Sequence, residues 1–413
     1  MKKSSAAISI IIGVIVAAAL SFAISADIAL FAGFIVAIAL LIYSDRRSVK
    51  LEGIIFIRRT QKGRSFIDRV AVRHRGFWRK MSYVGIALGI VFMVLGSLLL
   101  ISQAYAVLSG AEGGVKLLLP GPVSTPVNAP GVFVVPWWIW VIGIAFVIIP
   151  HEFMHGIMCR IDKVRIKSVG WLLLIVIPGA FVEPDEKQLA KTKRATKLRV
   201  YAAGSFANMI VAAIVLLVAF AAIFAMSASS VIMPSGVAFT PIKDGSAYNA
   251  SLSGSIIAIN DISIRTHAQL SSELSKYNPG DAISVSTAET YYVSGFFPQG
   301  VINRDNVTAK TVVLGSGENG KAFLGVGVLG ESVELNMSLQ AYAIISVLLF
   351  WIFLFSFGIG LVNLLPIKPL DGGLIFEELV SGSRHKKVIV RTVSVFMLLV
   401  LIFNIIGPLF LTG

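Results

Sequence analysis

Residues 150–156, with the sequence PHEFMHG, contain the pattern H-E-x-x-H and close a long apolar run that begins at Val132. On a helix, positions four residues apart share one face, so the rings of His151 and His155 can reach one metal ion. Glu152, beside the first histidine, is placed to take a proton from water at that ion. The pattern therefore predicts a metal site with hydrolytic chemistry inside an apolar helix.

A polar cluster with a purely structural role is the alternative explanation for these residues. Ionisable side chains inside a membrane span are costly, and they usually mark function. The chain has only five histidines, and two of them flank Glu152 within this apolar run. This placement favours a metal site over a packing role.

The composition of the chain is that of a membrane protein. Of its 413 residues, 56% are hydrophobic and 14% are charged, which is typical of a polytopic membrane protein rather than a soluble domain. The net charge of +14 could indicate nucleic-acid binding, but Lys and Arg gather in loops beside apolar runs, as membrane flanks do. We therefore expect the lipid bilayer as a partner and no nucleic acid. The single cysteine, Cys159, excludes an internal disulfide.

Apolar runs of about 20 residues, the length that crosses a bilayer, recur along the chain. They predict a polytopic α-helical membrane protein with about seven transmembrane helices, at residues 6–24, 28–43, 82–102, 132–158, 200–226, 339–362 and 388–411. The first run has two lysines before it and small residues after it, so a signal peptide is an alternative; we expect a transmembrane hairpin with a tight turn at Asp27. The apolar run 171–182 is too short to span and contains Pro178 and Gly179, which favours a re-entrant or interfacial hairpin.

The loop charges predict the orientation of the chain. Segments 45–80, 187–199 and 384–387 are strongly basic, so we expect them in the cytoplasm together with the N-terminus. Segments 103–131 and 227–338 lack this excess of positive charge and are expected outside. The predicted organisation is residues 1–131 with the first spans, 132–226 with H-E-x-x-H, an inserted extracytoplasmic domain at 227–338, and 339–413 with the last spans. The expected location is the cell membrane.

Two histidines do not complete a catalytic zinc site, which usually has three protein ligands. The fourth and sixth predicted spans both run inward, and the sixth ends at residues 363–373, where two prolines and two glycines prevent a regular helix. Asp371 in this segment is therefore expected on the same side of the membrane as the histidines. The rival third ligands in the sequence are Cys159, Asp162 and Glu183.

The motif H-E-x-x-H-G at 151–156, together with N-x-x-P-x-x-P-L-D-G at 363–372, resembles the site-2 protease family of intramembrane zinc metalloproteases. The resemblance covers roughly residues 132–382. It implies that His151, His155 and Asp371 hold Zn²⁺ and that Glu152 is the catalytic base. Residues 204–208 resemble the family's G-x-x-x-N pattern, which implies that Asn208 contacts the substrate or the developing oxyanion; an interhelical hydrogen bond is the alternative.

The external region, residues 234–334, is predicted to form short strands and turns, and it resembles the PDZ domain that many site-2 proteases carry at this place. We expect a last strand at 323–328, after an unusually long stretch at 291–321. A peptide-binding groove that works by strand addition is one expectation. A compact domain that only restricts access to the site is the other.

The resemblance implies a zinc metalloendopeptidase that hydrolyses peptide bonds within or near the transmembrane segments of membrane-anchored protein substrates. A membrane metal transporter is an alternative, but it would more often show internal repeats or paired carboxylates on several helices. A non-catalytic membrane chaperone is a further alternative, against which the retained Glu152 argues. The sequence makes no prediction of the oligomeric state.

Overall fold

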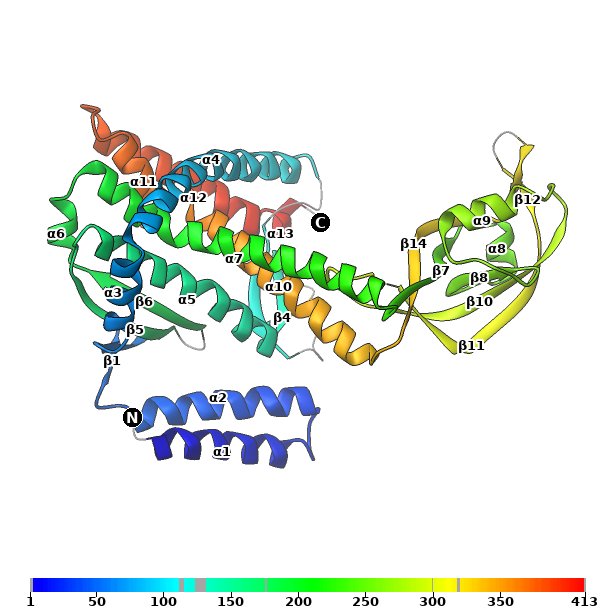
Figure 1. Ribbon diagram of the computed structural model, residues 1–413, viewed down its shortest axis with the longest axis horizontal. Coiled ribbons are helices and arrows are strands. Elements are labelled where there is room, and N and C mark those ends of the chain that lie inside the picture. The colour runs from blue at the N-terminus through cyan, green and yellow to red at the C-terminus, as the bar shows by residue number, and fades with distance from the viewer. Residues whose placement is uncertain are drawn as a thin grey trace. The chain divides into compact units, whose positions relative to one another are not determined.

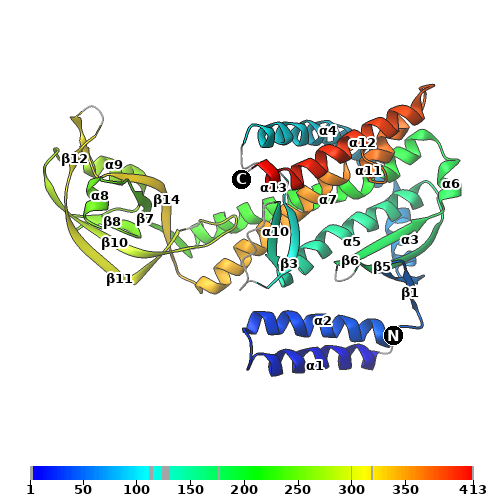
Figure 2. The same cartoon turned by 180° about the vertical axis from the view of Figure 1, so that it is seen from behind.

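The computed structural model describes residues 3–110, 115–122, 131–174, 177–298, 300–317 and 320–411 (Figure 1). The chain forms two compact units, one made of Met1–Ala213 with Ile352–Gly413, and the other of Ile214–Trp351. The first unit holds most of the long helices and a small sheet, and the second is built around a larger sheet (Figure 2).

Six helices in the described part of the chain are long and apolar enough to cross a membrane. They are α2 (Ala26–Ser44), α4 (Arg75–Leu108), α5 (Trp137–Ile161), α7 (Arg194–Ala228), α10 (Leu339–Asn363) and α12 (Lys386–Ile406). The seventh expected span is the helix α1 (Lys3–Leu20), whose apolar part, Ala6–Leu20, is shorter than the other six. The chain is thus a multi-pass membrane protein.

Helices α1 and α2 pack side by side as an antiparallel pair, with small residues at the contact (Figure 1). A Cβ atom on Gly13 would lie 2.6 Å from the carbonyl oxygen of Gly33, so the two backbones approach closely only because both positions are glycine. The turn between the helices precedes Asp27, contrary to expectation, because Asp27 lies in the first turn of α2. An acidic side chain is favourable there, since the N-terminal end of a helix carries positive partial charge.

The start of the fourth predicted span is a strand instead of a helix. Residues Val132–Pro136 form β4, which pairs in parallel with β3 (Leu117–Gly121), and α5 begins at Trp137. Three valines in this short run favour an extended backbone. Residues 111–114 and 123–130 of the expected external loop lie outside the described residues.

A four-stranded antiparallel sheet lies beside α5, with the strand order β1-β2-β5-β6. Its strands are β1 (Val49–Glu52), β2 (Ile55–Thr60), β5 (Ile166–Leu174) and β6 (Ile177–Pro184). The hairpin expected at 171–182 is therefore the β5–β6 hairpin, although residues 175–176 lie outside the described part. Strand β6 is an edge strand of the sheet and packs against α5.

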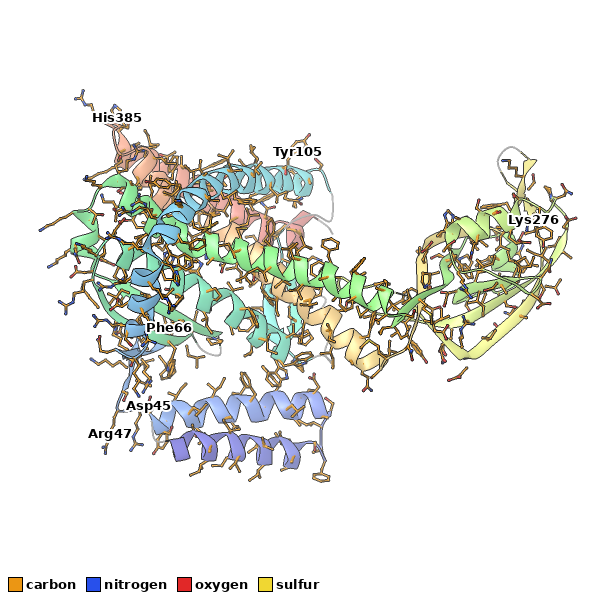
Figure 3. The ribbon with its side chains drawn as sticks, in the orientation of Figure 1. Asp45, Arg47, Phe66, Tyr105, Lys276 and His385 are labelled. Carbon is orange, nitrogen blue, oxygen red and sulfur yellow. The ribbon has the colours of Figure 1, made fainter. Side chains whose placement is uncertain are left out.

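The basic segment 45–80, expected to be a loop, is mostly structured. It supplies β1 and β2, the helix α3 (Arg64–Arg73) and the first turns of α4. Figure 3 marks Asp45 and Arg47 at its start, just after α2, and Phe66 on α3. The centre of the Phe66 ring lies 5.2 Å from the centre of the Phe153 ring on α5. The segment thus packs against the H-E-x-x-H helix.

The second unit contains a six-stranded sheet with the order β10-β11-β14-β7-β8-β9. The strands are β7 (Ile232–Pro241), β8 (Ser255–Ile259), β9 (Ile262–Ser263), β10 (Ala282–Tyr292), β11 (Gly300–Val313) and β14 (Val326–Leu335), accompanied by β12 (Gly315–Ser316), β13 (Ala322–Phe323), α8 (Ser246–Asn249) and α9 (His267–Leu274). The long stretch 291–321 contains the end of β10, the strand β11 and the short β12. The last strand is β14 rather than 323–328, because Gly325, at φ +74°, separates β13 from β14.

The end of the chain follows the predicted breaks in the helices. After α10 ends at Asn363, residues 364–370 are irregular, and α11 (Asp371–Leu379) begins at the proposed third ligand. The last expected span, 388–411, is divided into α12 and the short α13 (Pro408–Leu411). Proline cannot continue a helix because it lacks the N–H donor, which accounts for this division. The short α6 (Glu186–Ala190) connects β6 to α7.

Candidate metal centre

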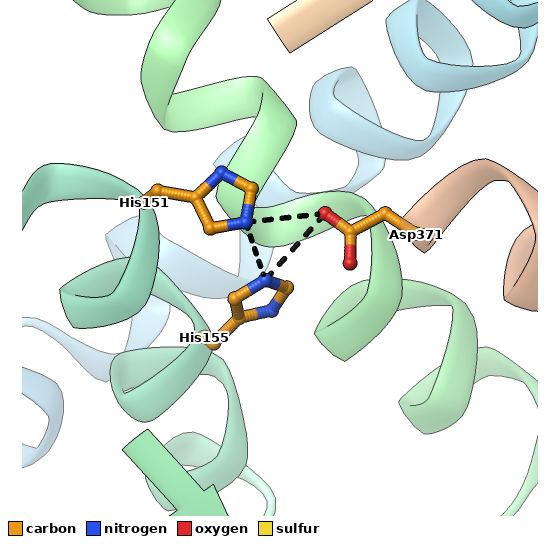
Figure 4. Close-up of side chains that lie close together, drawn as sticks. All are labelled: His151, His155 and Asp371. Carbon is orange, nitrogen blue, oxygen red and sulfur yellow. Dashed lines mark hydrogen bonds and ion pairs between the residues drawn. The ribbon is translucent and has the colours of Figure 1, made fainter. Parts of the chain in front are cut away.

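The two histidines of H-E-x-x-H lie on one face of α5, as their spacing predicts. Their Nε2 atoms are 3.2 Å apart. Asp371, the first residue of α11, places its Oδ2 atom 3.5 Å from the Nε2 atom of each histidine. Figure 4 shows the carboxylate facing both rings. Three candidate ligands from two distant parts of the sequence therefore converge on one point.

The glycines after Asp371 explain how its carboxylate reaches this point. A Cβ atom on Gly372 would collide with the carbonyl oxygens of Leu364 and Leu365. A Cβ atom on Gly373 would lie 2.6 Å from the carbonyl carbon of Ile367. The start of α11 thus folds tightly against the irregular segment before it, and only glycine permits that approach.

Helix α7 supplies at least one hydrogen-bonding partner to each of the three candidate ligands. The carbonyl oxygen of Val200 lies 2.6 Å from His155 Nδ1, and Ser205 Oγ donates to Asp371 Oδ2 at 3.2 Å. The amide of Asn208 lies 3.1 Å from His151 Nδ1. Such outer partners fix the orientation of metal ligands. The structure therefore places Asn208 against a histidine, which agrees with the interhelical hydrogen bond named above as the alternative to a substrate contact.

The tautomers of the rings suit metal binding. His155 Nδ1 donates its proton to the Val200 carbonyl, which leaves a lone pair on Nε2 facing the cluster. Within the described residues, Asn208 Oδ1 is buried without a hydrogen-bond partner. If the oxygen and nitrogen of this amide are exchanged, Asn208 Oδ1 accepts a hydrogen bond from His151 Nδ1–H. The Nε2 atom of His151 then carries a lone pair that faces the cluster, as the Nε2 atom of His155 does. Two neutral imidazoles and one carboxylate form a donor set that zinc accepts.

Space for an ion is kept open by Gly204. A Cβ atom at this position would collide with the Nε2 atoms of both His151 and His155. The first residue of the G-x-x-x-N pattern thus has a physical reason to be glycine, because any side chain would fill the point where the ligands meet. The donor atoms and the space between them are together compatible with a zinc ion.

Glu152 lies beside this cluster and faces the small sheet. Its Oε2 atom accepts a hydrogen bond of 2.9 Å from the backbone N–H of Val182, on the edge strand β6. The hairpin expected from the sequence therefore touches the candidate base. Val182 and Val200 were not predicted as site residues, because they contact the site through backbone groups. Ser205 was not predicted either, although it lies within the G-x-x-x-N pattern at 204–208.

The rival third ligands are occupied elsewhere. Cys159 is fully buried in an apolar cluster formed by α3, α5, β5, α6 and α7. Asp162 accepts hydrogen bonds from Thr196 and Arg199. Glu183 accepts one of 2.5 Å from Ser168. Of the four candidates, Asp371 is the one that the structure places with the histidines.

The comparisons with known proteins agree with this arrangement. Residues 139–406 match the sequence model of peptidase family M50, and the match contains α7 and all three candidate ligands. An uncharacterized protein of Methanocaldococcus jannaschii, MJ0971, is 27% identical over 355 residues, which cover 84% of this chain and 85% of that protein. Since the family match extends over more than half of the chain, this protein belongs to peptidase family M50, the metallopeptidases of the site-2 protease type.

Proposed function

We propose that the protein is an intramembrane zinc endopeptidase that hydrolyses peptide bonds within or near the transmembrane segments of membrane-anchored proteins. The observation that carries this proposal is that Asp371 converges with His151 and His155 beside Glu152, and that the last three lie on an apolar helix of an M50 peptidase. The expected orientation, with the N-terminus in the cytoplasm of a cell-membrane protein, is part of the proposal and rests on the basic segments.

In this proposal each residue of the site has a distinct role. His151, His155 and Asp371 hold the ion, and Val200, Asn208 and Ser205 orient them. A zinc ion supplies Lewis acidity, which polarises a carbonyl group and acidifies water. Glu152 accepts the proton of the attacking water and passes it to the leaving amine. The N–H of Val182 holds the Glu152 carboxylate in place.

The substrate has to unwind before cleavage, because the carbonyl groups of a transmembrane helix are engaged within the helix. Strand β6 is an edge strand of the small sheet, and its Val182 N–H donates to Glu152. A locally extended substrate can pair with such an edge by strand addition. The hairpin thus gives the unwound segment a place to bind beside the base.

The sheet of the second unit is proposed to form a PDZ-like domain outside the membrane. A groove of about 500 Å³ lies between α9 and the β13–β14 region, and its apolar lining includes Leu270, Leu274 and Phe323. This groove has the size and the apolar surface to accept an extended peptide. The domain contains none of the residues proposed for catalysis, so its proposed role is to select substrates.

The test is cleavage of single-span candidate substrates by purified protein in liposomes, compared with Glu152→Ala. This variant should keep its zinc and lose proteolysis, because the base is removed and the ligands remain. Cleavage at a near-normal rate by the variant would contradict the proposal. Metal flux into the same liposomes would instead indicate a transporter. Within the described residues, one cluster of three metal-binding side chains is found, and a transporter would need several such sites along a transport pathway.

A further inference from the structure

A nearly buried ionic junction lies at the end of α5, where Asp162 meets two other helices. Asp162 Oδ2 accepts hydrogen bonds from Arg199 Nη1 at 2.8 Å and from Thr196 Oγ1 at 2.9 Å, both on α7. Its Oδ1 atom accepts one of 3.2 Å from Arg79 on α4. The side chains of Asp162 and Arg199 are only 10% and 8% exposed, so this pair is largely withdrawn from water.

The junction has a defined geometry because its charges are nearly buried. Arg199 Nη2 also donates to Tyr83 Oη at 2.9 Å, and its guanidinium carbon lies 5.1 Å from the centre of the Tyr83 ring. Burial alone would raise the pKa of Asp162, but the hydrogen bonds from Thr196, Arg199 and Arg79, together with the positive charge of Arg199, hold the pKa below its usual value. A buried ion pair contributes little net stability, yet it strongly disfavours any arrangement that separates its partners.

The position of the junction on α7 links it to the metal centre. Arg199 directly precedes Val200, whose carbonyl group accepts a hydrogen bond from His155 Nδ1–H. Ser205 and Asn208, which contact Asp371 and His151, follow within the next turns of the same helix. Because a helix moves as a rigid rod, a slide or rotation of α7 against α5 would shift all three partners together.

Building on the proposed function, we infer that Asp162 and Arg199 are positioning residues that fix the register of α7 against α5 and thereby set the zinc affinity of the site. Asp162 itself touches neither the ion nor the substrate in this account. Its effect passes through Arg199 and the backbone of α7 to His155. The acidic residue that the sequence offers as a rival ligand thus acts on the site from one helix end.

The experiment measures zinc dissociation constants by chelator competition in the full-length protein. Asp162→Asn and Arg199→Gln should each weaken zinc binding about tenfold, the lower end of the loss seen when an outer partner of a ligand is removed. The double variant should lose no more than the single ones, because both changes break the same link. Arg199→Lys, which keeps the charge opposite Asp162, should recover much of the affinity.

Two matched controls separate register from general stability. Arg79→Gln removes the bond from Asp162 to α4 and leaves the bond to α7. Asp68→Asn removes the ion pair between Asp68 and Arg160, two residues before Asp162, without touching α7. The zinc dissociation constants of both variants should stay within about twofold of the wild-type value. Removing an outer partner of a metal ligand, by comparison, weakens metal binding by about tenfold or more. Thermal unfolding of each variant reports any change in stability separately.

Two results would overturn the inference while leaving the proposed function intact. One is wild-type zinc affinity in a folded Asp162→Asn protein. The other is an equal loss of affinity in the Asp68→Asn or Arg79→Gln controls. If Asp162→Asn fails to fold because Arg199 loses its partner, the charge-free double variant takes its place in the comparison. A wild-type protein that binds no zinc at all would contradict both the proposed function and this inference.

Discussion

Replacing Gly204 with alanine adds a single methyl group at the point where the candidate ligands meet. Its Cβ atom would collide with the Nε2 atoms of His151 and His155. Carbon and nitrogen atoms in ordinary contact stand about 3.5 Å apart, so the rings would have to withdraw by roughly 1 Å. Zinc–nitrogen bonds are about 2.0–2.1 Å long, and a ring that withdraws so far no longer binds the ion.

The size of the effect follows from which contacts are lost. Removing an outer partner of a ligand typically lowers metal affinity about 10–100-fold, so displacing two ligands directly should lower it by more than about 100-fold. On helix propensity alone, the same change should stabilise α7 by about 1 kcal/mol, because alanine is a better helix former than glycine. For Gly204→Ala, the metal-site account therefore predicts a loss of zinc affinity, whereas helix propensity alone predicts a small gain in stability and no change in zinc affinity.

The assay is the zinc dissociation constant by chelator competition and the zinc content of the purified protein by atomic emission, together with its thermal unfolding. Gly358→Ala is the matched control, because Gly358 also lies in a membrane helix, α10, and its added Cβ would meet nothing within 4 Å. That control should keep its zinc. A Gly204→Ala protein with one zinc ion per chain and wild-type affinity would refute the assignment of the ion to the space between these rings.

Three further predictions concern the third ligand, the contact that orients Glu152, and the inserted domain. Asp371→Ala should lower zinc content and activity together, whereas Cys159→Ala should change neither. Loss of zinc in the Cys159 variant with full zinc in the Asp371 variant would make Cys159 the third ligand. Val182→Pro removes the N–H that Glu152 accepts, at an edge strand where proline is tolerated, so zinc should stay bound while kcat falls; an unchanged kcat would exclude this orienting role. Deleting residues 234–334 should retain zinc and weaken discrimination against substrates with bulky external domains, as paired substrates that differ only in external size would show.

The sequence predicted the parts of this structure that depend on spacing and on apolar length. The four-residue interval between His151 and His155 fixes a shared helix face, and runs of about 20 apolar residues mark membrane helices. Because the fourth and sixth predicted spans both run inward, the topology alone predicts Asp371 on the same side of the membrane as the histidines. The segment around Pro366 and Pro369 was predicted to be irregular, and the structure confirms it.

Other features could not be predicted because the sequence carries no distinct signal for them. The periodicity of a short apolar run such as 132–136 fits a strand and a helix equally well. Because this run continues directly into the apolar residues of α5, the sequence predicts one long helix instead of the strand β4 followed by α5. The hairpin of β1 and β2 lies within a segment whose dominant property is positive charge. The contacts of Val200 and Val182 use backbone groups, which are the same for every residue except proline and so leave no mark in the sequence.

Peptide hydrolysis within the membrane is expected to require an ion held by His151, His155 and Asp371. The most direct measurement is cleavage of a single-span substrate in liposomes by protein that has been stripped with a chelator, before and after zinc is returned, with mass spectrometry of the products. We predict that cleavage stops in the stripped protein, returns with zinc, and occurs within or near the transmembrane segment. Cleavage that continues at full rate in the zinc-free protein would contradict the account.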